Sequence, residues 1–294
     1  MHQLSFWTST DHVVNVASVP QRSPFRYPGG KTWLVPYIRQ WLVSQREPPT
    51  LLLEPFAGGG IVGLTVAAER LAQRVLMVER DEAVGTVWHT ILHDHGGAEW
   101  LAQRIVSFTM NHASVAELLG APAASVRDRA FQTIVKNRVN RGGIMAPGAG
   151  LVKAGENGKG LLSRWYPETL KKRILDIVQM RDRLEFVQGD GLVVLAQHAL
   201  DLHAVFFIDP PYTVAGKRAG SRLYTYAQLD HRELFRLAST FAGDFLMTYD
   251  DAAEVRGLAE QHGFEVCTVA MKNTHHANMK ELLVGRSLAW LQEG

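Results

Sequence analysis

Short apolar runs alternate with helix-like stretches along most of the chain. Residues 51–54, 74–79 and 204–208 are mainly apolar, as expected of strands buried on both faces of a sheet. Residues 61–71 and 82–93 follow two of these runs and are predicted to be helices. Strands that alternate with helices in this way form parallel sheets covered on both faces. The pattern therefore predicts an α/β fold with a doubly wound sheet.

The same alternation resumes in the second half of the chain. A further helix should follow Lys31 near the start of the chain, and Pro36 should delay its beginning. No helix fits between the last two strands, so they should pair antiparallel. The sheet is therefore expected to be mostly parallel and Rossmann-like, with an antiparallel edge strand. The elements expected in the second half are helices over 167–182, 231–241 and 252–262 and strands over 184–187, 245–248, 265–271 and 282–291.

The middle of the chain, residues 96–174, interrupts this alternation. Helical stretches over 98–108 and 127–139 precede a glycine-rich stretch, 140–161, that cannot form a regular core element. Residues 136–173 contain nine lysines and arginines and two acids, a net charge of +7 in a chain whose total is +2. Positive charge concentrated on an irregular insert indicates a polyanionic partner.

Composition and these breaks set the domain organisation. With 46% hydrophobic and 20% charged residues, the chain has the composition of a globular protein. Its single cysteine, Cys267, excludes a disulfide framework and a Cys-cluster metal site, and we expect no metal. No signal peptide and no apolar run of roughly 20 residues is present, so we expect a cytoplasmic protein away from membranes. We divide the chain into an N-terminal extension (1–24), an α/β domain (25–95 and 175–294) and an inserted helical and loop region (96–174).

A glycine turn, Phe56 to Gly60, follows the first strand directly. Glycines are needed where the backbone approaches a ligand or adopts angles that a Cβ would forbid. Gly58, Gly60 and Gly63 also satisfy the dinucleotide pattern G-x-G-x-x-G. Glu79 ends the next strand about 20 residues on, where an acid binds ribose hydroxyls. The turn predicts an adenosine-containing ligand and leaves open which one.

A second motif, Asp209-Pro210-Pro211-Tyr212, follows the apolar strand 204–208. It therefore lies at the carboxyl end of a strand, where open α/β sheets bind ligands. An exocyclic amine such as adenine N6 is a poor nucleophile, because its lone pair is delocalised into the ring. Asp209 and the Pro210 carbonyl can accept the amine hydrogens and localise that lone pair, and Tyr212 offers a face on which a flipped base stacks.

Four segments in this order, RYPGGK (26–31), EPFAGGG (54–60), VERDEA (78–83) and DPPY (209–212), resemble the Dam-type (D12 class) adenine-N6 DNA methyltransferases. The resemblance implies S-adenosyl-L-methionine as cofactor and N6-methyladenine in DNA as product, made on a base flipped out of the duplex. It also implies that the α/β domain is the methyltransferase catalytic domain and that residues 96–174 form a target-recognition region.

The family's site residues carry over onto matching positions. Lys31 would hold the methionine carboxylate, with Tyr27 lining that end of the pocket. Glu79 would bind the ribose hydroxyls, and Asp190 would lie near the cofactor adenine. The remaining expected site residues are Phe56, Gly58 and Gly60 in the cofactor loop, and Asp209, Pro210, Pro211 and Tyr212 as the catalytic tetrapeptide, with Asp209 also at the cofactor.

Double-stranded DNA is the partner that the resemblance implies, with a monomer expected in solution. Family members also act beside separately encoded restriction endonucleases, and the sequence leaves open whether this chain does. The segment after Asn137-Arg138 lacks the aromatic and Asn-Gly positions of the family, so no target sequence is implied. The residues expected at the DNA are Lys136, Arg138, Arg141, Lys153, Lys159, Arg164, Lys217 and Arg218.

Other functions explain less of the sequence. Cytosine-C5 methylation needs a Cys nucleophile, and Cys267 lies within a predicted strand. Methylation of rRNA adenine N6 or of another base amine in nucleic acid remains open, because D/NPPY motifs also occur in RNA methyltransferases. An NAD-dependent oxidoreductase would account for the glycine turn but neither for DPPY nor for the basic insert. A DNA-binding protein without catalysis would require a missing catalytic residue, and the motifs lack none.

Overall fold

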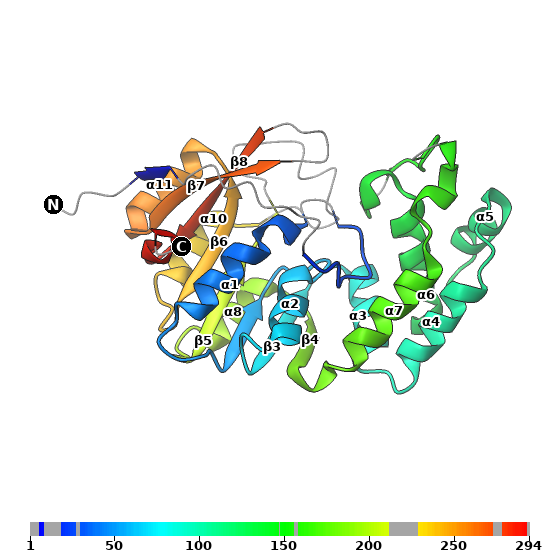
Figure 1. Cartoon of the computed structure of the whole chain (residues 1–294), viewed down its shortest axis with the longest axis horizontal. Coiled ribbons are helices and arrows are strands. Elements are labelled where there is room, and N and C mark those ends of the chain that lie inside the picture. The colour runs from blue at the N-terminus through cyan, green and yellow to red at the C-terminus, as the bar shows by residue number, and fades with distance from the viewer. Residues whose placement is uncertain are drawn as a thin grey trace.

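The computed structural model describes residues 6–8, 19–27, 30–146, 148–155, 158–211, 229–272 and 278–292. Within them, eight strands form one sheet in the order β1-β7-β8-β6-β5-β2-β3-β4 (Figure 1). Neighbouring strands are parallel except for β8, which is antiparallel to both β6 and β7. The strands are β1 (Phe6–Thr8), β2 (Leu51–Glu54), β3 (Arg74–Glu79), β4 (Leu184–Gln188), β5 (Ala204–Ile208), β6 (Phe245–Asp250), β7 (Glu265–Lys272) and β8 (Asn278–Gly285).

Helices cover both faces of this sheet, because its central strands are apolar on both sides. In β5, Val205 and Phe207 pack into one core cluster, and Phe206 and Ile208 pack into the other. The predicted Rossmann-like, mostly parallel sheet is therefore confirmed. The covering helices are α1 (Val35–Val43), α2 (Ile61–Glu69) and α3 (Glu82–Leu92) on one face, and α8 (Gly191–His198), α10 (His231–Ala238) and α11 (Ala253–His262) on the other.

The strand order places a switch point between β2 and β5. From β2 the chain continues to β3 and β4 on one side, and then returns to β5 on the other. Ligands of open α/β sheets bind at the carboxyl ends of the strands that flank such a point. Glu54 ends β2, and Asp209 directly follows β5, so both residues lie where a ligand is expected.

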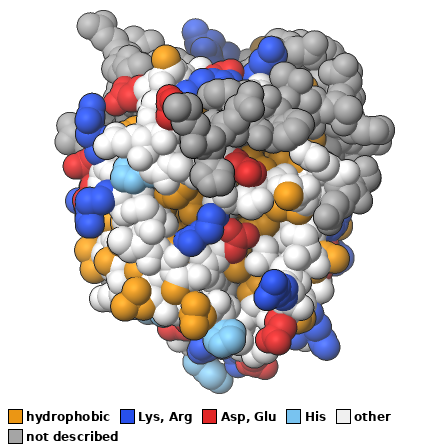
Figure 2. Space-filling view, turned by 90° about the vertical axis from the view of Figure 1, so that its left-hand side faces the viewer, with side chains coloured by type: hydrophobic (Ala, Val, Ile, Leu, Met, Phe, Trp, Pro, Cys, Tyr) orange, Lys and Arg blue, Asp and Glu red, His pale blue; other side chains and the backbone are white. Residues whose placement is uncertain are grey.

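The insert consists mainly of helices beyond the β4 edge of the sheet (Figure 1). Their apolar faces join the core cluster that also contains α2 and α3, with Leu101 and Phe131 as buried members. Figure 2 shows the side of the molecule opposite the insert, where acidic and basic side chains are mixed among hydrophobic ones. The insert helices are α4 (Gly97–Ser107), α5 (His112–Gly120), α6 (Val126–Val139) and α7 (Pro167–Val178).

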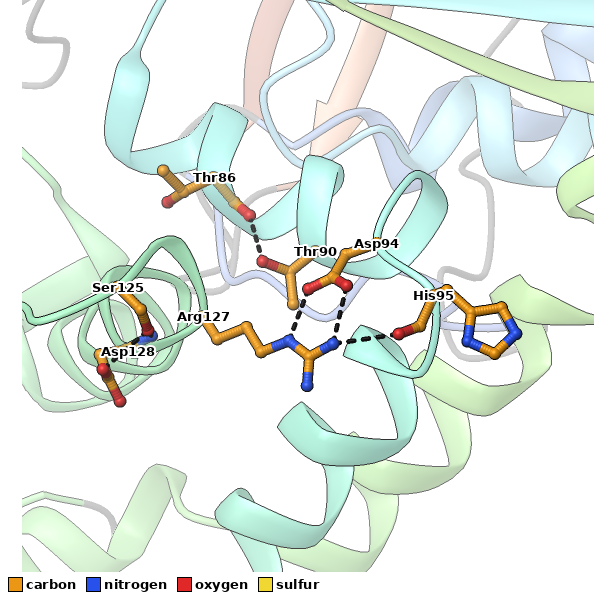
Figure 3. A network of polar contacts seen from close by, with 7 residues as sticks. All are labelled: Thr86, Thr90, Asp94, His95, Ser125, Arg127 and Asp128. Atoms are coloured by element: carbon orange, nitrogen blue, oxygen red, sulfur yellow. Dashed lines mark hydrogen bonds and ion pairs between the residues drawn. The ribbon is translucent and has the colours of Figure 1, made fainter.

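One ion pair fixes the start of α6 to the end of α3. Arg127 donates from Nε to Oδ2 of Asp94 at 2.6 Å and from Nη2 to Oδ1 at 2.7 Å (Figure 3). Nη2 also donates to the carbonyl of His95 at 3.0 Å. A guanidinium and a carboxylate joined through two hydrogen bonds have a fixed relative orientation. The pair therefore helps to hold the start of α6 against the end of α3, and the far end of α6 reaches the site described below.

The glycine-rich stretch forms no regular core element, as the sequence predicted. The amide of Arg141 donates to the Gly150 carbonyl, and the amide of Val152 donates to that of Val139, so the segment doubles back on itself. It contains the short 3₁₀ turn Arg141–Gly143, and a second one, Gly160–Arg164, begins near its end.

Several elements differ from the sequence-based expectation. Helix α8 was missed, and the last strand is β8 (278–285) instead of 282–291, with a 3₁₀ turn over Ala289–Gln292. The helix expected after Lys31 starts as a 3₁₀ turn, and α1 proper begins at Val35 with Pro36 in its first turn, where no backbone donor is needed. Within the extension, residues 6–8 form β1 beside β7. No helix in the described part of the chain could cross a membrane.

Candidate active site

The glycine turn after β2 is shaped by its neighbours. Gly58 and Gly60 have φ angles of +48° and +62°, in the left-handed region that favours glycine. A Cβ on Gly58 would lie 2.6 Å from the ring of Tyr27, and one on Gly63 would lie 2.6 Å from Oε2 of Glu54. Side chains larger than glycine would therefore displace Tyr27 from the turn and Glu54 from α2.

The segment before Lys31 is held on this turn and on the insert. Ser23 donates from its hydroxyl to the carbonyl of Gly59, and Trp88 donates from Nε1 to that of Gly58. Asn137, wholly buried in α6, accepts from the Arg26 amide at 2.9 Å and donates to the Arg26 carbonyl at 2.8 Å. Sheet, N-terminal segment and insert thus meet at one place.

A cavity of about 460 Å³ lies where these three parts meet. Its lining includes five of the residues expected at a cofactor, and the nearby α6 and α7 contribute basic side chains. Two residues expected at the DNA, Arg138 and Arg164, line the same cavity. The five residues expected at the cofactor are Tyr27, Lys31, Phe56, Gly60 and Asp209.

Asp209 is positioned by groups from two other elements. Its Oδ1 accepts a hydrogen bond of 2.7 Å from the hydroxyl of Thr248 in β6, which is wholly buried. Lys31 Nζ lies 3.2 Å from the same oxygen, while the Asp209 side chain keeps 23% of its surface exposed. The carboxylate is thus fixed in orientation and still reachable from the cavity. Of the other catalytic residues expected, Pro210 is buried and Pro211 partly buried, whereas Tyr212 lies outside the described residues.

Lys31 lies between two carboxylates. Its Nζ is 3.2 Å from Asp209 Oδ1 and 3.2 Å from Oε2 of Glu281 in β8. Burial alone would lower the pKa of Lys31, but the two carboxylates outweigh it and raise that pKa. Burial raises the pKa of Glu281 to about 7, against the opposing effect of Lys31. The contact of Lys31 with a cofactor carboxylate remains a prediction, since its ammonium group already has two anionic partners.

Glu54, at the end of β2, is a second buried acid in the lining. It accepts a hydrogen bond of 2.8 Å from the amide of Gly63. Burial raises its pKa to about 8, and the charges of Asp209 and Glu79 act in the same direction. Sequence reasoning assigned no role to Glu54 or Glu281. A charged residue within an apolar strand was the signal that could have found both.

The two acids expected to bind the adenosine part of the cofactor lie near the ends of the neighbouring strands, outside the cavity lining. Glu79 accepts from the amides of Gly58 and Asp81, each at 2.8 Å, and burial raises its pKa to about 7. Asp190 accepts from the amide of Leu192 at the start of α8. Gly58 is likewise next to the cavity without lining it.

The residues expected at the DNA divide into two groups. Arg138 is 5% exposed and donates to the carbonyl of Pro24, so it faces the cavity and not the outer surface. Arg164 lines the cavity and Lys136 is partly buried. Two arginines that sequence reasoning missed, Arg26 and Arg173, also line it. The residues of the second group, Arg141, Lys153 and Lys159, are exposed on the glycine-rich stretch, and Lys217 and Arg218 lie outside the described residues.

No group of three His, Cys, Asp or Glu side chains suited to a metal ion occurs in the described part of the chain. The site therefore consists of one oriented carboxylate, an internal lysine, a glycine turn and several arginines around one cavity. This arrangement offers hydrogen-bond acceptors to an amine and cationic groups to an anion.

Comparisons with known proteins give a general result. No protein-family model and no curated protein matches the sequence. Among solved structures, the chain is similar to an rRNA methyltransferase from Streptomyces viridochromogenes, with 16% identity, a TM-score of 0.39 and 91% and 88% of the two chains covered. It is also similar to a precorrin-6Y C5,15-methyltransferase from Geobacter metallireducens, with 9% identity, a TM-score of 0.35 and 94% of each chain covered. At these values the similarities do not indicate an activity for this chain.

Proposed function

We propose that this chain transfers a methyl group from S-adenosyl-L-methionine to the N6 amine of adenine in DNA. The observation that carries the proposal is the position of Asp209, which follows β5 at the switch point and shares a cavity with the glycine turn. In this proposal, residues 25–95 and 175–294 form the catalytic domain, and residues 96–174 form the target-recognition region.

Asp209 and the Pro210 carbonyl act on the amine. Thr248 and Lys31 both contact Oδ1 of Asp209 and hold its carboxyl group in one orientation, so that its oxygens can accept hydrogen bonds from an amine. Pro210 and Pro211 have no amide hydrogen to give to a sheet ladder, so the chain leaves the sheet here. Two acceptors beside one amine draw its hydrogens out of the plane of the base and localise the lone pair. No covalent enzyme intermediate is needed, and catalysis rests on positioning.

The residues at the turn fit the cofactor. Gly58 and Gly60 keep the turn free of side chains, and a carboxylate such as Glu79, with about four lone-pair sites, retains acceptor capacity beyond its two amide partners. The cofactor, when bound, supplies a methyl group activated by a sulfonium centre. The residues that would hold it are Tyr27, Lys31, Phe56, Gly58, Gly60, Glu79, Asp190 and Asp209.

The DNA would contact the basic surface of the insert. Arg141, Lys153 and Lys159 are exposed on the glycine-rich stretch, as residues that neutralise backbone phosphates must be. A base must leave the duplex to reach Asp209, because the carboxylate lies inside a cavity.

The test is transfer of labelled methyl groups to duplex DNA, single strands and RNA, followed by mass identification of the methylated nucleoside. We expect N6-methyladenine in DNA. Asp209→Asn should lower the rate at least tenfold, a barrier increase of about 1.4 kcal/mol or more, while cofactor binding persists. The matched control is Asp182→Asn, since Asp182 is exposed and away from the cavity. If RNA alone is labelled, the protein is an RNA methyltransferase and not a DNA methyltransferase. Full activity of Asp209→Asn would show that Asp209 takes no part in the reaction.

A further inference from the structure

Four arginines from separate parts of the chain meet at one end of the cavity. Arg26 lies on the N-terminal segment and Arg138 near the end of α6, whereas Arg164 belongs to a 3₁₀ turn and Arg173 to α7. The folding of the insert onto the N-terminal segment brings them together. We call these four residues the arginine cluster.

Two members are held by backbone carbonyls of the same short segment. Arg138 donates from Nη2 to the carbonyl of Pro24, and Arg173 donates from Nη1 to that of Ser23 at 3.1 Å. Arg138 is 5% exposed, and its Nε is buried without a hydrogen-bond partner among the described residues. A buried donor without a partner is costly, so a ligand that accepts from the cluster would be stabilised there.

Among the described residues, the charged groups that shift the pKa of Arg138 are arginines. Burial, followed by the charges of Arg173, Arg26 and Arg164 in that order, lowers the pKa of its guanidinium to about 9. The acids of the cavity lining are Glu54 and Asp209. Each of them accepts hydrogen bonds from other groups, Glu54 from Gly63 and Asp209 from Thr248 and Lys31.

We propose that the arginine cluster binds a phosphate group of the polynucleotide substrate, so that the cavity takes a nucleotide with its backbone phosphate and not the base alone. This inference rests on the proposed function, because it assumes that the base at Asp209 belongs to a nucleic acid. Guanidinium groups match phosphate oxygens through paired hydrogen bonds. Four cationic groups also exceed what a single carboxylate, such as that of the cofactor, would need.

The first test measures binding without methyl transfer. The affinity of the whole protein for duplex DNA is measured between 50 and 200 mM salt, with wild type, Arg164→Gln, Arg173→Gln and the double variant. Loss of one phosphate contact should lower the slope of log affinity against log salt by about 0.9. The control is Lys172→Gln, because Lys172 is exposed on the same helix beside Arg173 and pairs with Asp176. Its slope should stay at the wild-type value.

The second test separates phosphate from cofactor. Inorganic pyrophosphate, at constant ionic strength, should compete with DNA for wild type and at least tenfold less well for the double variant, while affinity for S-adenosyl-L-methionine stays unchanged. A weaker cofactor affinity with an unchanged salt slope would overturn the proposal and assign the cluster to the cofactor. So would an unchanged slope in all variants. If the double variant does not fold, as judged by circular dichroism, Arg164→Gln alone decides, since Arg164 is only partly buried.

The two proposals can fail separately. A protein whose DNA binding follows the predicted slopes, yet which methylates no DNA, retains the phosphate site and loses the proposed activity. A protein that methylates DNA while the variants bind with the wild-type slope retains the activity and loses the phosphate site.

Discussion

The two ends of the cavity differ in how their charges are balanced. At the Asp209 end, Lys31 lies 3.2 Å from each of two carboxylates, so this cation has anionic partners within the fold. At the other end, the charged groups that act on Arg138 are three further arginines. Lys31 thus has anionic partners within the fold, whereas under the phosphate proposal the arginine cluster would receive its anion from a ligand.

The difference between the two ends of the cavity follows from the parts of the fold on which their charged residues lie. Asp209 directly follows β5 and Glu281 lies within β8, with β6 between these two strands, while Lys31 lies in the 3₁₀ turn that precedes α1. The arginine cluster lies on the N-terminal segment and the insert, outside the sheet. A buried ion pair depends on both partners for stability, because removing one leaves the other charge uncompensated, whereas like charges held close together repel one another. We therefore expect the Asp209 end to serve catalysis and the arginine cluster to serve recognition of the substrate.

The largest effect is expected on breaking the balanced end. Lys31→Met leaves Asp209 and Glu281 close together without their cation, and the free energy of unfolding should fall by about 3–5 kcal/mol. Urea unfolding measures this loss, and adding Glu281→Gln to the variant should restore part of it. In the control Lys172→Met, the exposed pair with Asp176 is lost, at a cost below about 1 kcal/mol. Equal losses in Lys31→Met and Lys172→Met would show that the balanced end has no special role in stability.

A pH titration sharpens the same comparison. Burial raises the pKa of Glu54 to about 8 from an ordinary value of 4.5, so the folded state binds this proton more tightly than the unfolded state. Stability from this group is therefore present at low pH and is lost as pH rises from about 4.5 to about 8, by up to about 1.4 kcal/mol per pH unit. Urea unfolding at pH 5, 6, 7 and 8 should show a shallower fall for Glu54→Gln than for wild type. Parallel curves for the two proteins would contradict a raised pKa.

Apolar runs predicted most of the sheet, because burial on both faces leaves a plain sequence signal. Helix α8 was missed because it is only eight residues long and mainly apolar. The capping carboxylate of Asp190 is the one sequence signal for its start. The last strand was placed too late, because its first residues, such as Lys280 and Glu281, are polar and their strand conformation comes from pairing with β7. The local sequence pattern predicts a helix or strand well only where burial of its apolar residues alone determines its conformation.

The residues of the site also differ in whether a local sequence pattern could predict them. Tyr27, Lys31, Phe56 and Asp209 were found from motifs, because each lies in a short local segment beside a strand or turn. Their roles stay predictions. The arginine cluster could not be found as a unit, because its members are brought together by tertiary contacts such as those of Asn137 with the backbone of Arg26. The sequence indicated the positive charge of the insert but not that part of it faces inward.

The smallest effect on the free energy of unfolding is expected at the arginine cluster. Arg164→Gln removes one cation near Arg138, so relief of repulsion should offset the lost contacts and leave the free energy of unfolding within about 0.5 kcal/mol of wild type. Arg127→Gln, which breaks the ion pair with Asp94 elsewhere in the insert, should lower the free energy of unfolding by more than Arg164→Gln does. Both are measured by urea unfolding at low and high salt, and any gain from Arg164→Gln should shrink with salt, because screening weakens the repulsion. A larger loss for Arg164→Gln than for Arg127→Gln would mean that the arginine cluster is balanced after all, and the contrast between the two ends of the cavity would not hold.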